Sequence, residues 1–270
     1  MAPSTLMTSV PPVMAGKKLL LFGANGQLGW TFRQHLPAEQ LTVIDRQTAD
    51  LAHPEAIRAA IRIHRPDILL NAAAYTAVDK AQSEPELARQ INATAPGVMA
   101  EEAQALGACL VHFSTDYVFA GQGTRPYKET DPTGPLSVYG QTKLAGELAV
   151  QQACDRHLIF RTSWVVGEHG GNFMKTMLRL AAERDSLRVV ADQYGVPTSA
   201  KLLVQYSLMA VSHCLQSEVE QQAAPWGLYH LVPAGETTWH AYAQHVIGLA
   251  HAQGLMLKAR PEAVQPIRTE

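Results

Sequence analysis

The sequence predicts an α/β fold, with a doubly wound parallel sheet and a smaller C-terminal substrate lobe. Short apolar runs alternate with segments of helical spacing from Lys18 to Thr162, as in sheets whose strands are joined by helices. A glycine-rich turn separates the first apolar run from the first helical segment. Each run ends in a small or polar residue, at the sheet edge where ligands collect.

The elements follow one another in a regular order. The apolar runs predict strands at Lys18–Phe22, Leu41–Ile44, Asp67–Asn71, Cys109–Phe113 and Leu158–Arg161. Helical spacing predicts helices that begin near Gln27 and cover Pro54–His64, Glu86–Leu106 and Tyr139–Ala153. After Trp164 the alternation loosens, and we expect a helix, a strand and a loop at Asn172–Glu183, Leu187–Val190 and Asp192–Ser199. The distinctive strand-end residues are Gly23, Asp45, Asn71, Thr115 and Thr162.

The turn after the first strand carries the clearest motif, Gly-Ala-Asn-Gly-Gln-Leu-Gly at 23–29. Its glycines allow a tight turn and a close approach of backbone to a pyrophosphate, which the start of the next helix stabilises. This context predicts a Rossmann-type domain that binds NAD or NADP. The candidate cofactor residues of the turn are Gly23, Asn25, Gly26, Gln27, Leu28 and Gly29.

Four residues near the second strand are expected to contact the adenosine half of the cofactor. Asp45 is placed to bind the ribose hydroxyls of NAD, whereas Arg46 suits the 2′-phosphate of NADP, so the preference stays open. Asp50 and Leu51 are candidates for the adenine slot. A cap on the helix that begins near Pro54 is the alternative role of Asp50.

The third strand is followed by small side chains. Asn-Ala-Ala-Ala-Tyr-Thr at 71–76 lets a flat cofactor lie against backbone, although the same residues also permit plain close packing. In this topology we favour a cofactor contact. The candidate residues are Ala73, Ala74, Tyr75 and Thr76.

Tyr139 and Lys143 are the candidate catalytic pair, and both are also expected to contact the cofactor. Their spacing places them one turn apart on one face of a helix. An ammonium there favours the phenolate, so we expect the pKa of Tyr139 to fall from ~10 toward neutrality. Thr115 ends the fourth strand and is expected to bind the reacting oxygen, with a cap on the next turn as the alternative.

Four further residues are assigned to the substrate. Asp116 lies beside Thr115, and Trp164 is expected to form an apolar wall over a sugar ring, with a core position as the alternative. Asn172 and Phe173 open a helix whose N–H groups suit a diphosphate. Lys175 and Arg179 lie nearby in the sequence.

Composition narrows the functional class. The 270 residues are 47% apolar and 17% charged, with a net charge of −2, which predicts a globular protein without general affinity for nucleic acid or anionic membrane. Three widely spaced cysteines indicate neither disulfides nor zinc, and we expect a reduced, cytoplasmic compartment. The histidines form no metal-ligand spacing, and His112, His157 and His230 are interpreted as packed or surface residues. No apolar stretch approaches the ~18 residues of a membrane span.

We expect three parts along the chain. Residues 1–16 mix Pro, Ser, Thr and Met without the features of a secretory signal, and are predicted to be a disordered extension in which Met14 is an alternative start. Residues 17–165 are the predicted dinucleotide-binding domain. Residues 166–270 are mainly the predicted substrate lobe, interleaved with the sheet.

A series of ordered motifs resembles the dTDP-4-dehydrorhamnose reductases of the extended short-chain dehydrogenase/reductase family, from about Lys18 to Glu270. Besides the glycine turn, the similar segments are 71–81, 114–119, 135–147, 160–164, 172–178, 192–198 and 227–231. The resemblance implies a Rossmann domain with a nucleotide-sugar lobe. It also implies reduction of the C4 ketone of dTDP-4-dehydro-L-rhamnose by NADPH or NADH, with the product supplying surface polysaccharide such as O-antigen.

The resemblance also implies residue roles. Tyr139 would donate the proton, Lys143 would hold the nicotinamide ribose, Thr115 would orient the ketone, and Trp164 would contact the sugar. Some members form a homodimer bridged by Mg²⁺ through a carboxylate that follows the tryptophan of the first helix. Thr31 follows Trp30 here and cannot replace that ligand, so no metal residue is assigned.

Other relatives give alternative readings. Nucleotide-sugar 4,6-dehydratases usually carry Asp-Glu after the strand-end threonine, where this chain has Asp116-Tyr117, which counts against dehydration. Two alternatives are a nucleotide-sugar epimerase or reductase of another kind, and a non-catalytic subunit like the regulatory subunit of methionine adenosyltransferase. Relatives continue past the position of Glu270 into an Arg-Pro-containing segment that helps close the lobe, so the resemblance implies a shortened lobe and, as a third alternative, an inactive remnant.

Overall fold

The structure is a computed structural model that describes residues 11–269. Its six-stranded sheet is parallel throughout and has the order β10-β5-β4-β3-β1-β2. The strands are β1 (Leu19–Phe22), β2 (Leu41–Ile44), β3 (Ile68–Asn71), β4 (Cys109–Thr115), β5 (His157–Thr162) and β10 (Gly227–His230). The chain moves outward from β1 in both directions, so the doubly wound parallel sheet predicted from the sequence is confirmed.

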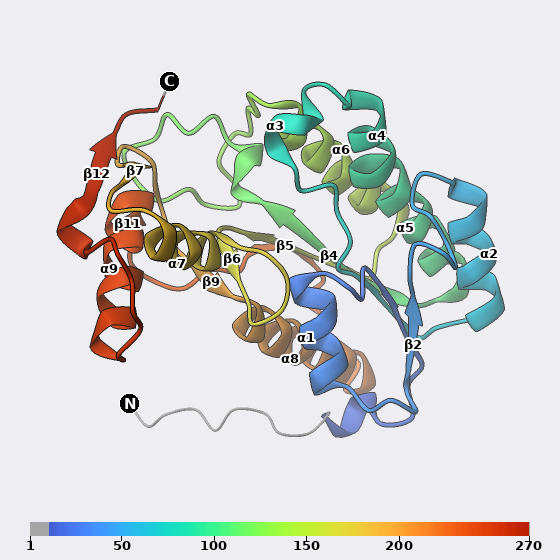
Figure 1. Ribbon diagram of the computed structural model, residues 1–270. Coiled ribbons are helices and arrows are strands. Elements are labelled where there is room, and N and C mark those ends of the chain that lie inside the picture. Colours follow the sequence, from blue (N-terminus) through green and yellow to red (C-terminus); the bar gives the residue numbers. More distant parts are fainter. Residues whose placement is uncertain (1–10, 270) are drawn as a thin grey trace. The chain divides into compact units, whose positions relative to one another are not determined.

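Helices cover both faces of this sheet (Figure 1). They are α1 (Gln27–His35), α2 (Pro54–His64), α3 (Val78–Ala81), α4 (Pro85–Arg89), α5 (Ala95–Leu106), α6 (Val138–Ala153) and α8 (Ala200–Val219), with a π-helical turn η2 (Gln90–Thr94) and 3-10 turns η1 (Pro12–Met14) and η3 (Asp116–Val118). Helices α2, α5 and α6 lie on one side, and α1 and α8 on the other. Within residues 11–269, no helix combines the length and apolar character needed to cross a membrane.

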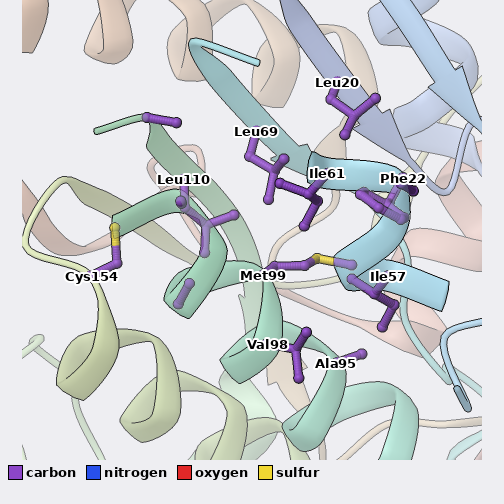
Figure 2. Close-up of a cluster of buried hydrophobic side chains, with 14 of the residues drawn as sticks. Leu20, Phe22, Ile57, Ile61, Leu69, Ala95, Val98, Met99, Leu110 and Cys154 are labelled. Carbon is purple, nitrogen blue, oxygen red and sulfur yellow. The ribbon is translucent and has the colours of Figure 1, made fainter. Parts of the chain in front are cut away.

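Each face of the sheet has its own core because successive side chains of a strand point to opposite faces. Leu20 and Phe22 of β1 pack with Ile61 of α2 and with residues of α5 in one cluster (Figure 2). On the other face, the ring of Phe32 in α1 lies 6.1 Å from the ring of Phe113 in β4. A shift of one residue in strand register would exchange these two sets, so burial fixes the register.

The chain divides into two units, each with its own contacts. The sheet unit contains the described residues up to Thr162 together with Lys201–Leu231, and the second unit contains Ser163–Ala200 and the described residues from Val232 onward. Residues 201–231 therefore belong to the sheet unit, although they follow position 165. The second unit contains β6 (Val165–Val166), α7 (Phe173–Glu183), β7 (Leu187–Val190), β8 (Tyr194–Gly195), β9 (Thr198–Ser199), β11 (Thr237–Thr238), α9 (Trp239–Ala252), η4 (Pro261–Ala263) and β12 (Val264–Ile267).

Three expectations from the sequence need correction. Helix Glu86–Leu106 is interrupted by the π-helical turn η2 between α4 and α5. The predicted loop Asp192–Ser199 contains the short strands β8 and β9. The predicted disordered extension is wrong for Pro12–Met14, which form η1 with Met14 fully buried, and residues 1–10 lie outside the described range.

The turn between β1 and α1 is held by close backbone contacts. Gly23 has φ +82°, and a Cβ there would lie 2.5 Å from the backbone nitrogen of Ala73, which follows β3. A Cβ at Gly29 would overlap the carbonyl oxygen of Gly23. Strands β1 and β3 are the neighbours at which the chain order reverses, the place where such sheets bind ligands. The glycines therefore bring two loops together at that point.

Replacing Gly29 by alanine is expected to lower the free energy of unfolding by about 1–3 kcal/mol, because the added methyl must push α1 away from the Gly23 carbonyl. Chemical denaturation would measure the change. Gly171→Ala is the matched control, since a Cβ at Gly171 meets nothing within 4 Å. Equal stability of the Gly29 and Gly171 variants would contradict this account of the turn.

Candidate active site

The glycine turn presents backbone donors at the start of α1. Gly26 is the N-cap and carries no side chain that would cap the first-turn N–H groups. Such groups, with the positive end of the helix dipole, bind anions. Both the donors and the close approach at Gly23 and Gly29 fit the pyrophosphate of a dinucleotide. The contacts assigned to Asn25, Gln27 and Leu28 stay predictions.

A carboxylate and a guanidinium follow β2. Asp45 Oδ1 accepts hydrogen bonds from Gln47 N at 3.0 Å and from Thr48 N and Oγ1, both at 2.8 Å, and these bonds, mainly those from Thr48, lower the pKa of Asp45. The Arg46 side chain is 81% exposed, and its Nε donates to Asp50 Oδ2 at 3.0 Å. Groups suited to ribose hydroxyls and to a 2′-phosphate thus lie side by side in the sequence at this strand end.

Asp50 organises the turn before α2. Its Oδ1 accepts from Ala52 N at 3.0 Å, and the N-cap of α2 is His53. The alternative in which Asp50 caps that helix is therefore wrong. Leu51 is partly buried against the sheet core. The adenine contacts of Asp50 and Leu51 stay predictions.

The loop after β3 is held by a side chain that sequence reasoning missed. Asn92 in η2 accepts from Tyr75 N at 2.9 Å and donates to Tyr75 O at 3.1 Å and to Thr142 Oγ1 at 3.2 Å. The Tyr75 hydroxyl donates to Glu84 Oε2 at 2.6 Å. An asparagine in the middle of a predicted helix is the signal that could have found it, because asparagine is a poor helix former. Ala73, Ala74 and Thr76 lie in this loop, and their cofactor contacts stay predictions.

Thr115, Asp116 and Tyr139 come together at the carboxyl end of β4. Helix α6 begins after Ser137, whose Oγ accepts from Gly140 N at 3.1 Å. Thr115 Oγ1 donates to Asp116 Oδ1 at 2.9 Å and accepts from Tyr117 N at 3.2 Å. Thr115 therefore also caps the next turn, as its alternative reading predicted. The ring of Tyr139 meets that of Tyr117 edge-on, with centroids 5.5 Å apart.

The electrostatics of this cluster differ from the expectation. Burial raises the pKa of Tyr139 to about 12; a hydrogen bond with Thr115 lowers it, while Asp116 and Tyr117 raise it further. The predicted fall of the Tyr139 pKa toward neutrality is therefore wrong in this structure, because desolvation outweighs the hydrogen bond with Thr115. Burial also raises the pKa of Asp116 to about 6, against the effect of its hydrogen bond with Thr115.

Lys143 is buried one helical turn after Tyr139, with 1% of its surface exposed. Its Nζ donates to the carbonyl oxygen of Phe113 at 2.6 Å and lies 3.4 Å from Nε2 of His112. Burial lowers the pKa of Lys143 to about 8, and the charge of Glu147 opposes that shift. His112 therefore belongs to this cluster, although from the sequence it is interpreted as a packed or surface residue.

A buried ion pair lies one turn further along α6. Arg161 Nε and Nη2 donate to the two carboxylate oxygens of Glu147 at 2.9 and 2.7 Å, with side-chain exposures of 7% and 2%. The guanidinium also lies 5.0 Å from the centre of the Phe119 ring. Such bidentate geometry offsets much of the cost of removing both charges from water.

The second unit holds the remaining candidates. Trp164 has φ +46° and stacks on Trp239, with ring centroids 3.5 Å apart at 15°, and the Phe173 ring lies 4.4 Å from that of Trp239. Asn172 caps α7 by accepting from Lys175 N at 3.0 Å. The Trp164 and Phe173 rings thus belong to one aromatic cluster, and the substrate contacts of Trp164, Asn172 and Phe173 stay predictions.

Two cations near α7 are engaged locally. Lys175 Nζ donates to the carbonyl oxygens of Glu168 at 2.5 Å and Gly170 at 2.9 Å, and Arg179 pairs with Glu183 at 3.1 Å. Thr31, which stands where some family members carry a metal-binding carboxylate, lies in the first helix, and its hydroxyl donates to Gln27 O at 2.8 Å. The described residues contain no group of three or more His, Cys, Asp and Glu side chains arranged to hold a metal ion.

Known proteins resemble the chain over nearly its whole length. The family model of the RmlD substrate binding domain matches residues 17–270. dTDP-4-dehydrorhamnose reductases of Salmonella typhimurium and Escherichia coli K12 are 50% and 49% identical over 244 residues, or 88% of this chain and 80% of each relative. The crystal structure of a dTDP-4-dehydrorhamnose reductase from Bacillus anthracis in complex with NADP is 34% identical, with a TM-score of 0.84 over 94% of this chain and 85% of that chain. Together with the sheet and its glycine turn, these similarities show that the chain belongs to the dTDP-4-dehydrorhamnose reductase family.

Proposed function

We propose that the protein reduces the C4 ketone of dTDP-4-dehydro-L-rhamnose to dTDP-L-rhamnose with a nicotinamide cofactor. The observation that carries the proposal is the half-buried phenol of Tyr139 beside Thr115 at the sheet edge, with the buried amine of Lys143 one turn further along its helix. The names of relatives up to 50% identical support the substrate. The product would supply surface polysaccharide such as O-antigen, and the three free, buried cysteines support a reducing compartment such as the cytoplasm.

Each residue of the cluster has a distinct task. A nicotinamide cofactor, when bound, supplies the hydride. Thr115 binds the carbonyl oxygen and orients it toward Tyr139, which donates its proton as negative charge develops on that oxygen. Because the pKa of Tyr139 is raised to about 12, the phenol stays protonated at neutral pH and is ready to act as the acid. The amine of Lys143, when charged, stabilises the phenolate that remains.

The glycine turn and the loop after β3 supply the binding surface for the cofactor. At Gly23 and Ala73 the two loops meet backbone to backbone, with no room for a side chain on Gly23. Tyr75 is fixed on both its backbone groups by Asn92, so the loop is held before any ligand arrives. Preorganisation of this kind reduces the entropy lost on binding.

Tyr139→Phe is expected to lower kcat by at least ~10²-fold, because it removes only the acid that protonates the developing alkoxide. Affinity for NADPH should change little, since the ring remains. Oxidation of NADPH in the presence of the keto sugar, followed by absorbance, would measure kcat. Tyr206→Phe, at an exposed position on α8, is the control. Full activity of the Tyr139 variant would disprove this role.

The rate of reduction is expected to fall as pH rises through about 8, the pKa of Lys143. Below this pH the amine is charged and stabilises the phenolate, whereas above it the neutral amine cannot. The pH dependence of kcat at saturating substrate and cofactor would show the decline. Lys143→Arg should be less active, but its pH profile should lack this alkaline limb, the decline in kcat above about pH 8, because arginine stays charged. A wild-type profile that is flat from neutral pH to well above 8 would contradict the assignment.

A further inference from the structure

His112 lies between a strand-end amide and the amine of the candidate site. It is fully buried on β4, and the parallel register pairs it with Asn71 of β3. Neighbouring residues in register point to the same face of a sheet, and here both side chains point toward α6. Nδ1 of the imidazole lies 3.0 Å from Asn71 Nδ2, and Nε2 lies 3.4 Å from Lys143 Nζ.

The hydrogen bonds of Asn71 fix which nitrogen of His112 carries the proton. Asn71 Oδ1 accepts from Ala73 N at 3.2 Å, so the NH₂ group is the one that faces His112 and donates to Nδ1. Burial and the charge of Lys143 hold the pKa of His112 well below its usual range, so the ring is neutral. A neutral imidazole whose Nδ1 accepts must carry its hydrogen on Nε2.

That N–H faces the amine of Lys143. An ammonium group has donors and no acceptor, so charged Lys143 and the N–H of His112 oppose each other, whereas a neutral amine can accept from it. The distances agree with this opposition: Nζ is 2.6 Å from the Phe113 carbonyl oxygen and 3.4 Å from Nε2. The imidazole therefore directs the amine toward Phe113 and disfavours its charge.

We propose that His112 is a positioning residue for the reduction: Asn71 fixes its tautomer, and the N–H presented in this way orients the Lys143 amine and disfavours its charged form. The inference rests on the proposed function. The chain of bonds from Ala73 through Asn71 and His112 to Lys143 links the loop after β3 with the amine beside the proton donor. It ends in amide groups, which are neither acids nor bases near neutral pH, so it orients the amine and does not conduct protons.

The other ionisable groups around Lys143 do not orient its amine in place of His112. Glu147, on the same helix, favours the charged amine, but both its oxygens are bound to Arg161 of β5. Tyr139 lies one turn before Lys143 and is protonated at neutral pH. Asp116 of η3 is directed at Thr115. Among the residues described, His112 is the ionisable side chain within hydrogen-bonding distance of the amine.

Nitrogen-15 NMR of the wild-type protein tests the tautomer without substrate and without a variant. The imidazole of His112, assigned through its bonds to the backbone, should show a protonated Nε2 and an unprotonated Nδ1 over the range in which Lys143 titrates. A proton on Nδ1 would overturn the proposal. Because this measurement needs no turnover, it separates failure of the proposal from failure of the proposed reductase activity.

Two variants test the consequence for catalysis. Asn71→Leu removes the donor to Nδ1, so the ring can turn its Nε2 lone pair toward the ammonium, and the alkaline limb of kcat should move up by about one pH unit. His112→Phe keeps an aromatic ring but no polar atom, and should lower kcat by about tenfold or more, because a misplaced group costs rate. The Kd for NADPH should change much less than kcat.

His157→Phe is the matched control. His157 lies on β5 opposite Leu110, near the amino end of β4, and its ring contacts the Cys154 carbonyl oxygen, so kcat and its pH profile should stay as in the wild type. An alkaline limb that does not move in Asn71→Leu would overturn the proposal. So would a His112→Phe variant whose kcat and pH profile match those of His157→Phe.

Discussion

The close approach of two backbone segments where the sheet order reverses is the constraint on which the rest of the site depends. The carbonyl of Gly23 lies where a Cβ of Gly29 would be, and Ala73 N lies where a Cβ of Gly23 would be. Side chains are therefore excluded from this point, and α1 begins directly above the strand edge. The same contact fixes the loop after β3, from which the bonds to Asn71 and onward to Lys143 start.

Burial of polar groups gives the site its chemical character. Desolvation favours the uncharged form of each ionisable group, which raises the pKa of Tyr139 and lowers that of Lys143. A phenol that keeps its proton and an amine that readily gives up its charge are thus produced by the same low-dielectric surroundings. The side chains of Glu147 and Arg161 are accommodated at this depth because each satisfies the hydrogen bonds of the other.

Much of the fold follows from the sequence, because buried parallel strands are continuous apolar runs and the glycine turn has a specific steric cause. Strand β2 and helix α2 begin and end where the pattern predicts. Helix α8 was missed, since it is buried on much of its surface and shows no clear polar face. The spacing of Tyr139 and Lys143 can be predicted from the sequence, because it depends only on the geometry of one helix. The roles of His112 and Asn92 cannot be predicted in this way, because they depend on contacts between residues that are far apart in the sequence.

The π-helical turn η2 explains how Asn92 reaches the loop that it holds. A π-turn adds one residue to a helix, and such insertions are frequent at functional sites. Its wider backbone carries Asn92 O to the surface of α6 at Gly146, where no Cβ could stand. Loss of any one residue between Gln90 and Thr94 would restore regular α geometry and rotate everything on one side of the cut by about 100°. Homologous sequences should therefore tolerate length changes in surface loops far more readily than within this single turn.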